Sequence, residues 1–142
     1  MSKSIIDKIK TFEDARAVLN INNNIPDVSM ILEENRKFII AAHKLLIIIK
    51  ALNGGWEPNL NDNNENKYLP YFHYKSEGGC ASSFGFSGTA YVNWITFTTV
   101  GSRLCFKTEE LAEYAGKQFL SIYRDYLTLE DKELRKINAF LS

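Results

Sequence analysis

Histidine and cysteine are the residue types that most readily act as metal ligands, bases or nucleophiles, and this chain has two of each. His43 lies in a long apolar and basic stretch, and His73 lies among tyrosines. Neither has a cysteine or a second histidine at the spacing of a metal site. We therefore predict structural roles for both histidines, and neither a metal nor a cofactor.

Cys105 is the most plausible nucleophile. It lies between Arg103 and Lys107 in a stretch that alternates like a strand, so the three side chains would share one face. Neighbouring cations stabilise a thiolate and lower its pKa. No base is recognisable near it, and cysteines are commonly buried and inert. We favour an inert thiol, and a protein that is not an enzyme.

Aromatic residues beside cations offer a different chemistry, because bases, nucleotides and sugars stack on rings while cations hold phosphates. Aromatic residues make up 13% of the chain and crowd into residues 56–126. Core packing accounts for most of them. Strand alternation and the nearby cations predict a smaller set of residues as a ligand or partner site. These residues are Tyr71, His73, Tyr91, Arg103 and Lys107.

The polar loop of residues 53–67 resembles a calcium loop, because asparagine and acidic residues alternate from Asn59. A calcium loop beginning there requires glycine at position 64 and glutamate at position 70. The chain has Asn64 and Pro70 instead. Turn hydrogen bonds are the better interpretation of this loop.

Two long helices are predicted. The first covers residues 29–52, with Asp27 or Ser29 as its cap and an end at residues 53–55. The second covers residues 108–127, where Thr108 is placed to cap and Gly116 would permit a close approach to another element. Shorter helices are expected at residues 12–19 and 129–140, the first opened by a capping box from Thr11 to Asp14.

The helix at 29–52 carries a basic face that two isoleucines, Ile40 and Ile47, interrupt. Either another element covers these isoleucines or they form a self-association surface. The cations themselves would serve a nucleic-acid partner if they were exposed and continuous. They are Arg36, Lys37, His43, Lys44 and Lys50.

Four short strands are predicted at residues 68–75, 83–92, 94–100 and 103–107, and their tight spacing favours antiparallel hairpins. The fold class is therefore α+β. We expect a small four-stranded, mainly antiparallel sheet packed by the two long helices, with short N- and C-terminal helices. Residues 1–142 form a single domain, with N-terminal helices over 1–52 and the sheet and C-terminal helices over 53–142.

Charge and hydropathy restrict the partners and the cellular location that we expect. Lysine plus arginine and aspartate plus glutamate number 17 each, so the net charge of zero gives no general attraction to nucleic acid or to an anionic membrane. We find no signal-peptide pattern at the start and no apolar run long enough to span a bilayer. We expect a cytoplasmic protein with no membrane partner.

Three passages resemble a group of small proteins encoded in prophages and mobile elements of gut anaerobes. They are HKLLIIIKALNGGWEPN (residues 43–59), NENKYLPYF (residues 64–72) and GSRLCFKTEELAEYAGKQFLSIYRDYL (residues 101–127). The likeness covers roughly residues 38–127. It implies a prophage or mobile-element setting and no particular activity.

Together these observations favour a non-enzymatic binding or interaction module that self-associates and contacts a host or phage macromolecule. We expect a homo-oligomer with a host or phage protein as partner. Two alternatives remain. One is a small-ligand or nucleotide binder, such as a phage inhibitor of host defence, with a pocket of sheet aromatics and Arg103 or Lys107 facing in. The other is a nucleic-acid binder that uses the basic helix face.

Overall fold

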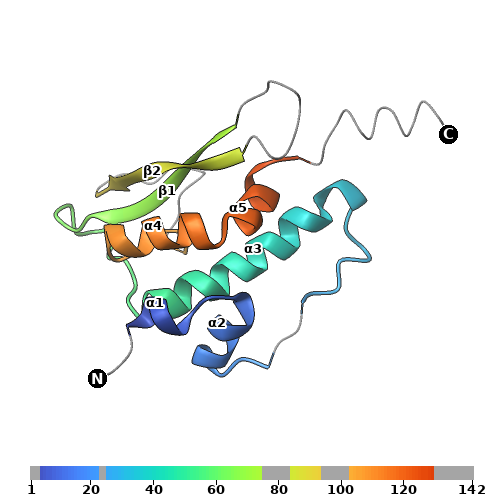
Figure 1. The fold of residues 1–142 in the computed structure, drawn as a ribbon, viewed down its shortest axis with the longest axis horizontal. Helices are drawn as coiled ribbons and strands as arrows, with labels where there is room; N and C mark the ends of the chain where they lie inside the picture. The colour runs from blue at the N-terminus through green and yellow to red at the C-terminus, as the bar shows by residue number, and fades with distance from the viewer. Residues whose placement is uncertain (1–3, 23–24, 75–83, 94–102, 130–142) are drawn as a thin grey trace.

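A computed structural model describes residues 4–22, 25–74, 84–93 and 103–129 (Figure 1). Figure 1 shows an α+β arrangement in layers, with α4 and α5 between the sheet and α3, and with α1 and α2 on the other side of α3. The elements in chain order are α1 (Ile5–Lys8), α2 (Phe12–Leu19), α3 (Glu33–Leu52), β1 (Lys67–Tyr74), β2 (Phe84–Val92), α4 (Glu109–Gln118) and α5 (Leu120–Leu127).

The prediction of a four-stranded sheet is wrong. The described residues form a two-stranded antiparallel sheet in which Lys67 pairs with Val92 and Tyr74 with Phe84. The register shifts between Tyr71 and Phe72, which places a bulge in the middle of the pair. The strand predicted at 94–100 lies outside the described residues.

The strand predicted at 103–107 is reduced to a bridge between Phe106 and Tyr68, whose backbone hydrogen bonds measure 2.7 and 3.0 Å. The other edge of this segment bonds to a side chain. Asn53 Nδ2 donates to the Cys105 carbonyl at 3.0 Å, and the Lys107 N–H donates to Asn53 Oδ1 at 3.0 Å. One buried amide therefore satisfies the two backbone groups that a neighbouring strand would satisfy.

The prediction of a second long helix is also wrong, because residues 108–127 form two helices. Phe119, at φ −109° and ψ 32°, separates α4 from α5. The two halves pack on different surfaces: α4 covers β1 and β2, whereas α5 packs mainly on α3. The break buries Phe119 and Tyr123 in the core, and among the described helices only α3 is long.

Several local signals are confirmed. The capping box of Thr11 and Asp14 opens α2, and the Thr108 hydroxyl accepts the Leu111 N–H at the start of α4. Gly116 does permit a close approach, since a Cβ there would lie 2.6 Å from the Phe86 ring. The start of α3 differs from the prediction, because Leu32 precedes it without a side-chain cap.

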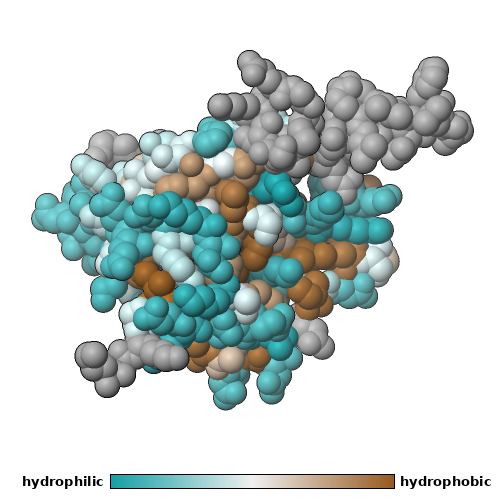
Figure 2. All heavy atoms as spheres, viewed as in Figure 1, coloured by the Kyte–Doolittle hydropathy of each residue, from teal (hydrophilic) through white to brown (hydrophobic). Residues whose placement is uncertain are grey.

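The core joins α2, α3, α4 and α5 with the Phe106 segment. Its fully buried large side chains are Ile9, Leu45, Ile48, Ile49, Leu52, Cys105 and Phe106. Figure 2 shows a largely polar face on which apolar side chains gather beside the start of α3. Within the described ranges, every helix is too short or too polar to cross a membrane.

Candidate functional site

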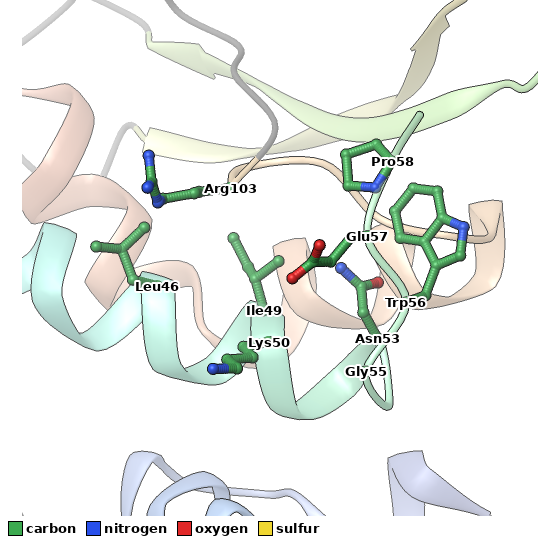
Figure 3. Close-up of a pocket in the computed structure, with 9 residues that line it drawn as sticks. All are labelled: Leu46, Ile49, Lys50, Asn53, Gly55, Trp56, Glu57, Pro58 and Arg103. Carbon is green, nitrogen blue, oxygen red and sulfur yellow. The ribbon is translucent and has the colours of Figure 1, made fainter. Parts of the chain in front are cut away.

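A cleft of about 250 Å³ lies where α3 ends (Figure 3). The last turns of α3 present Leu46, Ile49 and Lys50 to it. The chain then turns through Gly54 and Gly55, whose φ values of +58° and +90° are ones that residues with a side chain rarely adopt. This turn carries Trp56, Glu57 and Pro58 back along the cleft, and Arg103 lines it from the segment that leads to Phe106.

Asn53 holds the two sides of the cleft together. Its side chain is 8% exposed, and both ends of its amide bond to the backbone of residues 105 and 107. Arg103 is therefore presented from a segment that is tied to the end of α3, close to Lys50. The same bonds leave the Asn53 amide committed to the protein rather than to a ligand.

The charged residues of the cleft are Lys50, Glu57 and Arg103, and all three are exposed. None of them forms an ion pair or a hydrogen bond with another residue of the described chain. The apolar part consists of Leu46, which is 39% exposed, and the buried Ile49. The described lining of the cleft therefore combines an apolar floor with a net charge of +1.

The described lining residues carry few of the groups that act in catalysis. Among the described residues, the lining includes one carboxylate and no histidine, cysteine, serine or threonine. Glu57 and Lys50 are the titratable groups among the described lining residues apart from Arg103, and no ion pair or hydrogen bond joins them in the described chain. Nor do the described residues hold three histidine, cysteine, aspartate or glutamate side chains grouped for a metal ion.

The predicted sheet site is divided between two faces. Tyr71 and His73 are both exposed on the face turned away from α4. Their rings lie over the partner strand, where a Cβ at Gly88 or Gly85 would come within 2.8 Å of them. His73 Nδ1 lies 2.7 Å from Ser87 Oγ.

Tyr91 belongs to the other face of the sheet. It pairs with Tyr68, and the two rings meet edge-on with centroids 6.1 Å apart. It lies two residues from Thr89, whose hydroxyl bonds to Glu109 of α4 at 2.9 Å. Tyr91 itself is 59% exposed.

The two cations of the predicted ligand site, Arg103 and Lys107, also lie in different surroundings. Arg103 lines the cleft, whereas Lys107 is exposed and does not. The aromatic side chain of the cleft is Trp56, from the loop after α3, in place of the sheet aromatics that were predicted to form a pocket.

The basic face of α3 is partly covered by α2. The Phe12 ring meets His43 edge-on at 6.1 Å, and Lys44 Nζ lies 5.7 Å from its centroid. On the same face Ile47 is 8% exposed and belongs to the core, while Ile40 is half-buried. This arrangement favours the interpretation in which another element covers the isoleucines.

The remaining cations of that face have separate surroundings. Arg36 donates to the carbonyls of Ile31 and Ser29 at 2.9 and 3.3 Å, which fixes the turn before α3. Lys37 is exposed, and Lys50 lines the cleft.

Cys105 is buried, and this burial raises the pKa of its thiol despite the opposing charge of nearby Lys67. Arg103 and Lys107, which flank it in sequence, are both exposed. A buried thiol with a raised pKa is poorly nucleophilic at neutral pH. The geometry thus agrees with the inert interpretation.

Lys67 is a residue that sequence reasoning missed. Its side chain is buried, and its ammonium group donates to the carbonyls of Asp62 and Asn93 at 2.9 and 3.0 Å, with Glu65 at 3.7 Å. The calcium-like loop thus encloses an ammonium group. Its polar side chains also make the predicted turn bonds, as where Asn59 Oδ1 accepts the Asn61 N–H.

Most of the cleft escaped prediction too, because Asn53, Trp56 and Glu57 carry no motif, and Lys50 was predicted only as part of a basic helix face. They nevertheless fall within one passage, residues 43–59, that carries the resemblance described above.

Comparisons with protein-family models, with curated proteins and with solved structures each gave no match.

Proposed function

We propose that this chain is a non-enzymatic binding module and that its ligand site is the cleft at the end of α3. One observation carries the proposal: Lys50, Glu57 and Arg103 line the same cleft as an apolar floor, and none of them is paired with another described residue. Such a combination of a few unpaired polar groups with apolar surface is typical of small-ligand sites. The prophage or mobile-element setting stays a proposal drawn from the resemblance.

Tryptophan fluorescence tests this function directly. The chain has two tryptophans, Trp56 and Trp94, so the Trp94→Phe variant retains only the tryptophan of the cleft. We expect that a ligand found by screening metabolites will change the Trp56 emission in a saturable way. It should also raise the free energy of unfolding, by about 2.7 kcal/mol at a hundredfold excess over its Kd.

A pair of leucine variants locates the binding. Leu46→Phe adds bulk at the cleft, whereas Leu60→Phe makes the same change at an exposed leucine outside it. We expect Leu46→Phe to weaken the ligand at least several-fold and Leu60→Phe to leave its affinity unchanged. Equal affinity in both variants would contradict the cleft as the site.

Self-association is a second candidate function, favoured by a different observation from the one that the sequence suggested. Leu32 and Phe38, at the start of α3, are 68% and 43% exposed, and the Phe38 ring stacks on Tyr126 at 5.1 Å. Light scattering at two protein concentrations tests it. A dimer that Phe38→Ser converts to a monomer would support association through this surface, and a monomer at both concentrations would contradict it.

A further inference from the structure

We propose that the ligand of the cleft is a small organic anion. Its carboxylate or phosphate group binds between Lys50 and Arg103, and its apolar body lies over Leu46 and Ile49 toward Trp56. The inference rests on the proposed function, because it names the ligand class of the same site.

The two cations carry the argument. Arg103 and Lys50 both line the cleft, and together they provide several N–H donors and two positive charges, which suits a carboxylate or phosphate. Both residues lack an ionic partner among the described residues, although the chain as a whole has as many acidic as basic residues. A local positive excess in a neutral chain is what an anionic ligand would neutralise.

Size and apolar surface restrict the rest of the ligand. The cleft volume of about 250 Å³ falls just below the range of about 300–1,000 Å³ typical of sites for drug-sized ligands. Leu46 and Ile49 offer apolar contact but no hydrogen bonds from their side chains. The ligand is therefore small, and its charge lies at one end of an apolar or aromatic body.

Glu57 makes the site selective. Its carboxylate lines the same cleft and has no described partner, so it repels an anion placed close to it. A hydroxyl or amino group on the ligand would instead donate a hydrogen bond to Glu57. The site thus discriminates by the position of the charge, with the anion at the Lys50–Arg103 end.

Nuclear magnetic resonance titration of the full chain tests the inference with matched probes. The anionic probes are 3-phenylpropanoate and phenyl phosphate, and the neutral probe is 3-phenylpropan-1-ol, each titrated at low and at moderate salt. The amide signals of Gly54 and Gly55 and the Trp56 indole N–H report binding in the cleft. We expect both anions to bind about tenfold or more tightly than the alcohol, and their affinity to fall as salt rises. Tighter binding of phenyl phosphate than of the carboxylate would assign the natural ligand to phosphate compounds, and the reverse order to carboxylic acids.

Variants that each remove one charge test what each charged residue contributes to binding. We expect Lys50→Gln and Arg103→Gln each to weaken phenyl phosphate by about tenfold. Glu57→Gln should strengthen it about two- to threefold. Lys107→Gln is the matched control, because Lys107 is an exposed cation in the same segment as Arg103 but outside the cleft. It should change the affinity less than twofold.

The outcomes separate the two proposals. If the alcohol binds the cleft as tightly as the anions, or if Lys107→Gln weakens phenyl phosphate as much as Arg103→Gln does, the anion assignment is wrong and the binding module stands. If no probe of any charge shifts the cleft signals, both proposals are contradicted. All four variants change exposed side chains, so unchanged thermal midpoints should accompany the binding data.

Discussion

At the residue scale, two tyrosines on neighbouring helices differ in what their hydroxyl groups meet. The Tyr114 hydroxyl donates to the Ile9 carbonyl at 2.6 Å. The Tyr123 hydroxyl is buried and has no hydrogen-bond partner in the described part of the chain. A buried hydroxyl without a partner opposes folding, whereas a bonded one stabilises it.

The matched pair Tyr114→Phe and Tyr123→Phe should therefore shift stability differently. Tyr114→Phe should lower the free energy of unfolding by about 1 kcal/mol, because the Ile9 carbonyl loses its donor. Tyr123→Phe should leave it unchanged or raise it by up to about 1 kcal/mol. Urea unfolding at pH 7 measures both. A larger loss for Tyr123→Phe than for Tyr114→Phe would contradict this account of the two hydroxyls.

The same residues predict how stability depends on alkaline pH. Burial raises the pKa of Cys105 above 9.0, and it raises the pKa of Tyr114 and that of Tyr123 above 10.0. The unfolded chain then loses these protons at a lower pH than the folded chain does. Their contribution to stability is complete below pH 9 and declines as pH rises through the folded-state pKa values.

We therefore expect the free energy of unfolding to fall between pH 9 and pH 11, and to fall less steeply in Tyr123→Phe above pH 10. Urea titrations at half-unit steps of pH measure the slope. A free energy of unfolding that rises between pH 9 and pH 11 would contradict the raised pKa values of these buried groups.

At the element scale, the tie between α3 and the segment before α4 determines the shape of the site. The sequence indicated that α3 ends at Asn53, Gly54 and Gly55, and it does end there. It did not indicate that the Asn53 side chain reaches the backbone 52 and 54 residues further on. That bond depends on tertiary packing, which no local pattern reports.

Asn53→Ala should lower the free energy of unfolding by about 2–3 kcal/mol, since it leaves a buried carbonyl and a partly buried N–H without partners. Asn63→Ala, at an exposed asparagine of the following loop, is the control and should cost less than about 0.5 kcal/mol. Asn53→Ala should also weaken the binding of any cleft ligand, because it removes the bonds that hold the Arg103 segment beside α3. Equal stability of the two variants would contradict the role given to Asn53.

The contact between α4 and the sheet gives another element-scale prediction. Gly116→Ala gains about 1 kcal/mol of helix propensity, but its Cβ would lie 2.6 Å from the Phe86 ring and 2.9 Å from Pro70 Cβ. Overpacking typically costs about 1–3 kcal/mol, so after the propensity gain is subtracted we expect a net loss of up to about 2 kcal/mol. The loss should be smaller in a Phe86→Leu background, and an equal loss in both backgrounds would exclude the Phe86 contact as its cause.

The sequence was most informative about elements where the signal is local. The capping residues Thr11 and Thr108 and the close approach at Gly116 were predicted because each depends on neighbouring residues or on one glycine. The break at Phe119 was missed because the apolar stripe is continuous across it. At Phe119, the packing of α4 on the sheet and of α5 on α3 overrides helix propensity. Residues 103–107 have a strand-like pattern, but Asn53 takes the edge that a further strand would need.

At the scale of the whole molecule, the described residues that line the cleft come from the end of α3, the loop after it and the Arg103 segment, and none comes from the sheet that the sequence made central. Of the five residues predicted to share one ligand surface, Arg103 lines the cleft. Tyr71 and His73 lie on the outer sheet face, Tyr91 on the other face, and Lys107 outside the cleft. Alternation along a strand predicts which side chains share a face, but not which face another element covers. The aromatic composition therefore did not indicate the cleft.

The central claim is that the cleft at the end of α3 binds a ligand. The most direct measurement is an amide and indole shift map of the isotope-labelled chain, titrated with a panel of anionic, neutral and cationic fragments. We expect saturable shifts confined to residues 46–58 and Arg103, and their loss in Leu46→Phe. Shifts that cluster on Tyr71 and His73 instead, or a panel that leaves residues 46–58 unmoved, would contradict the claim.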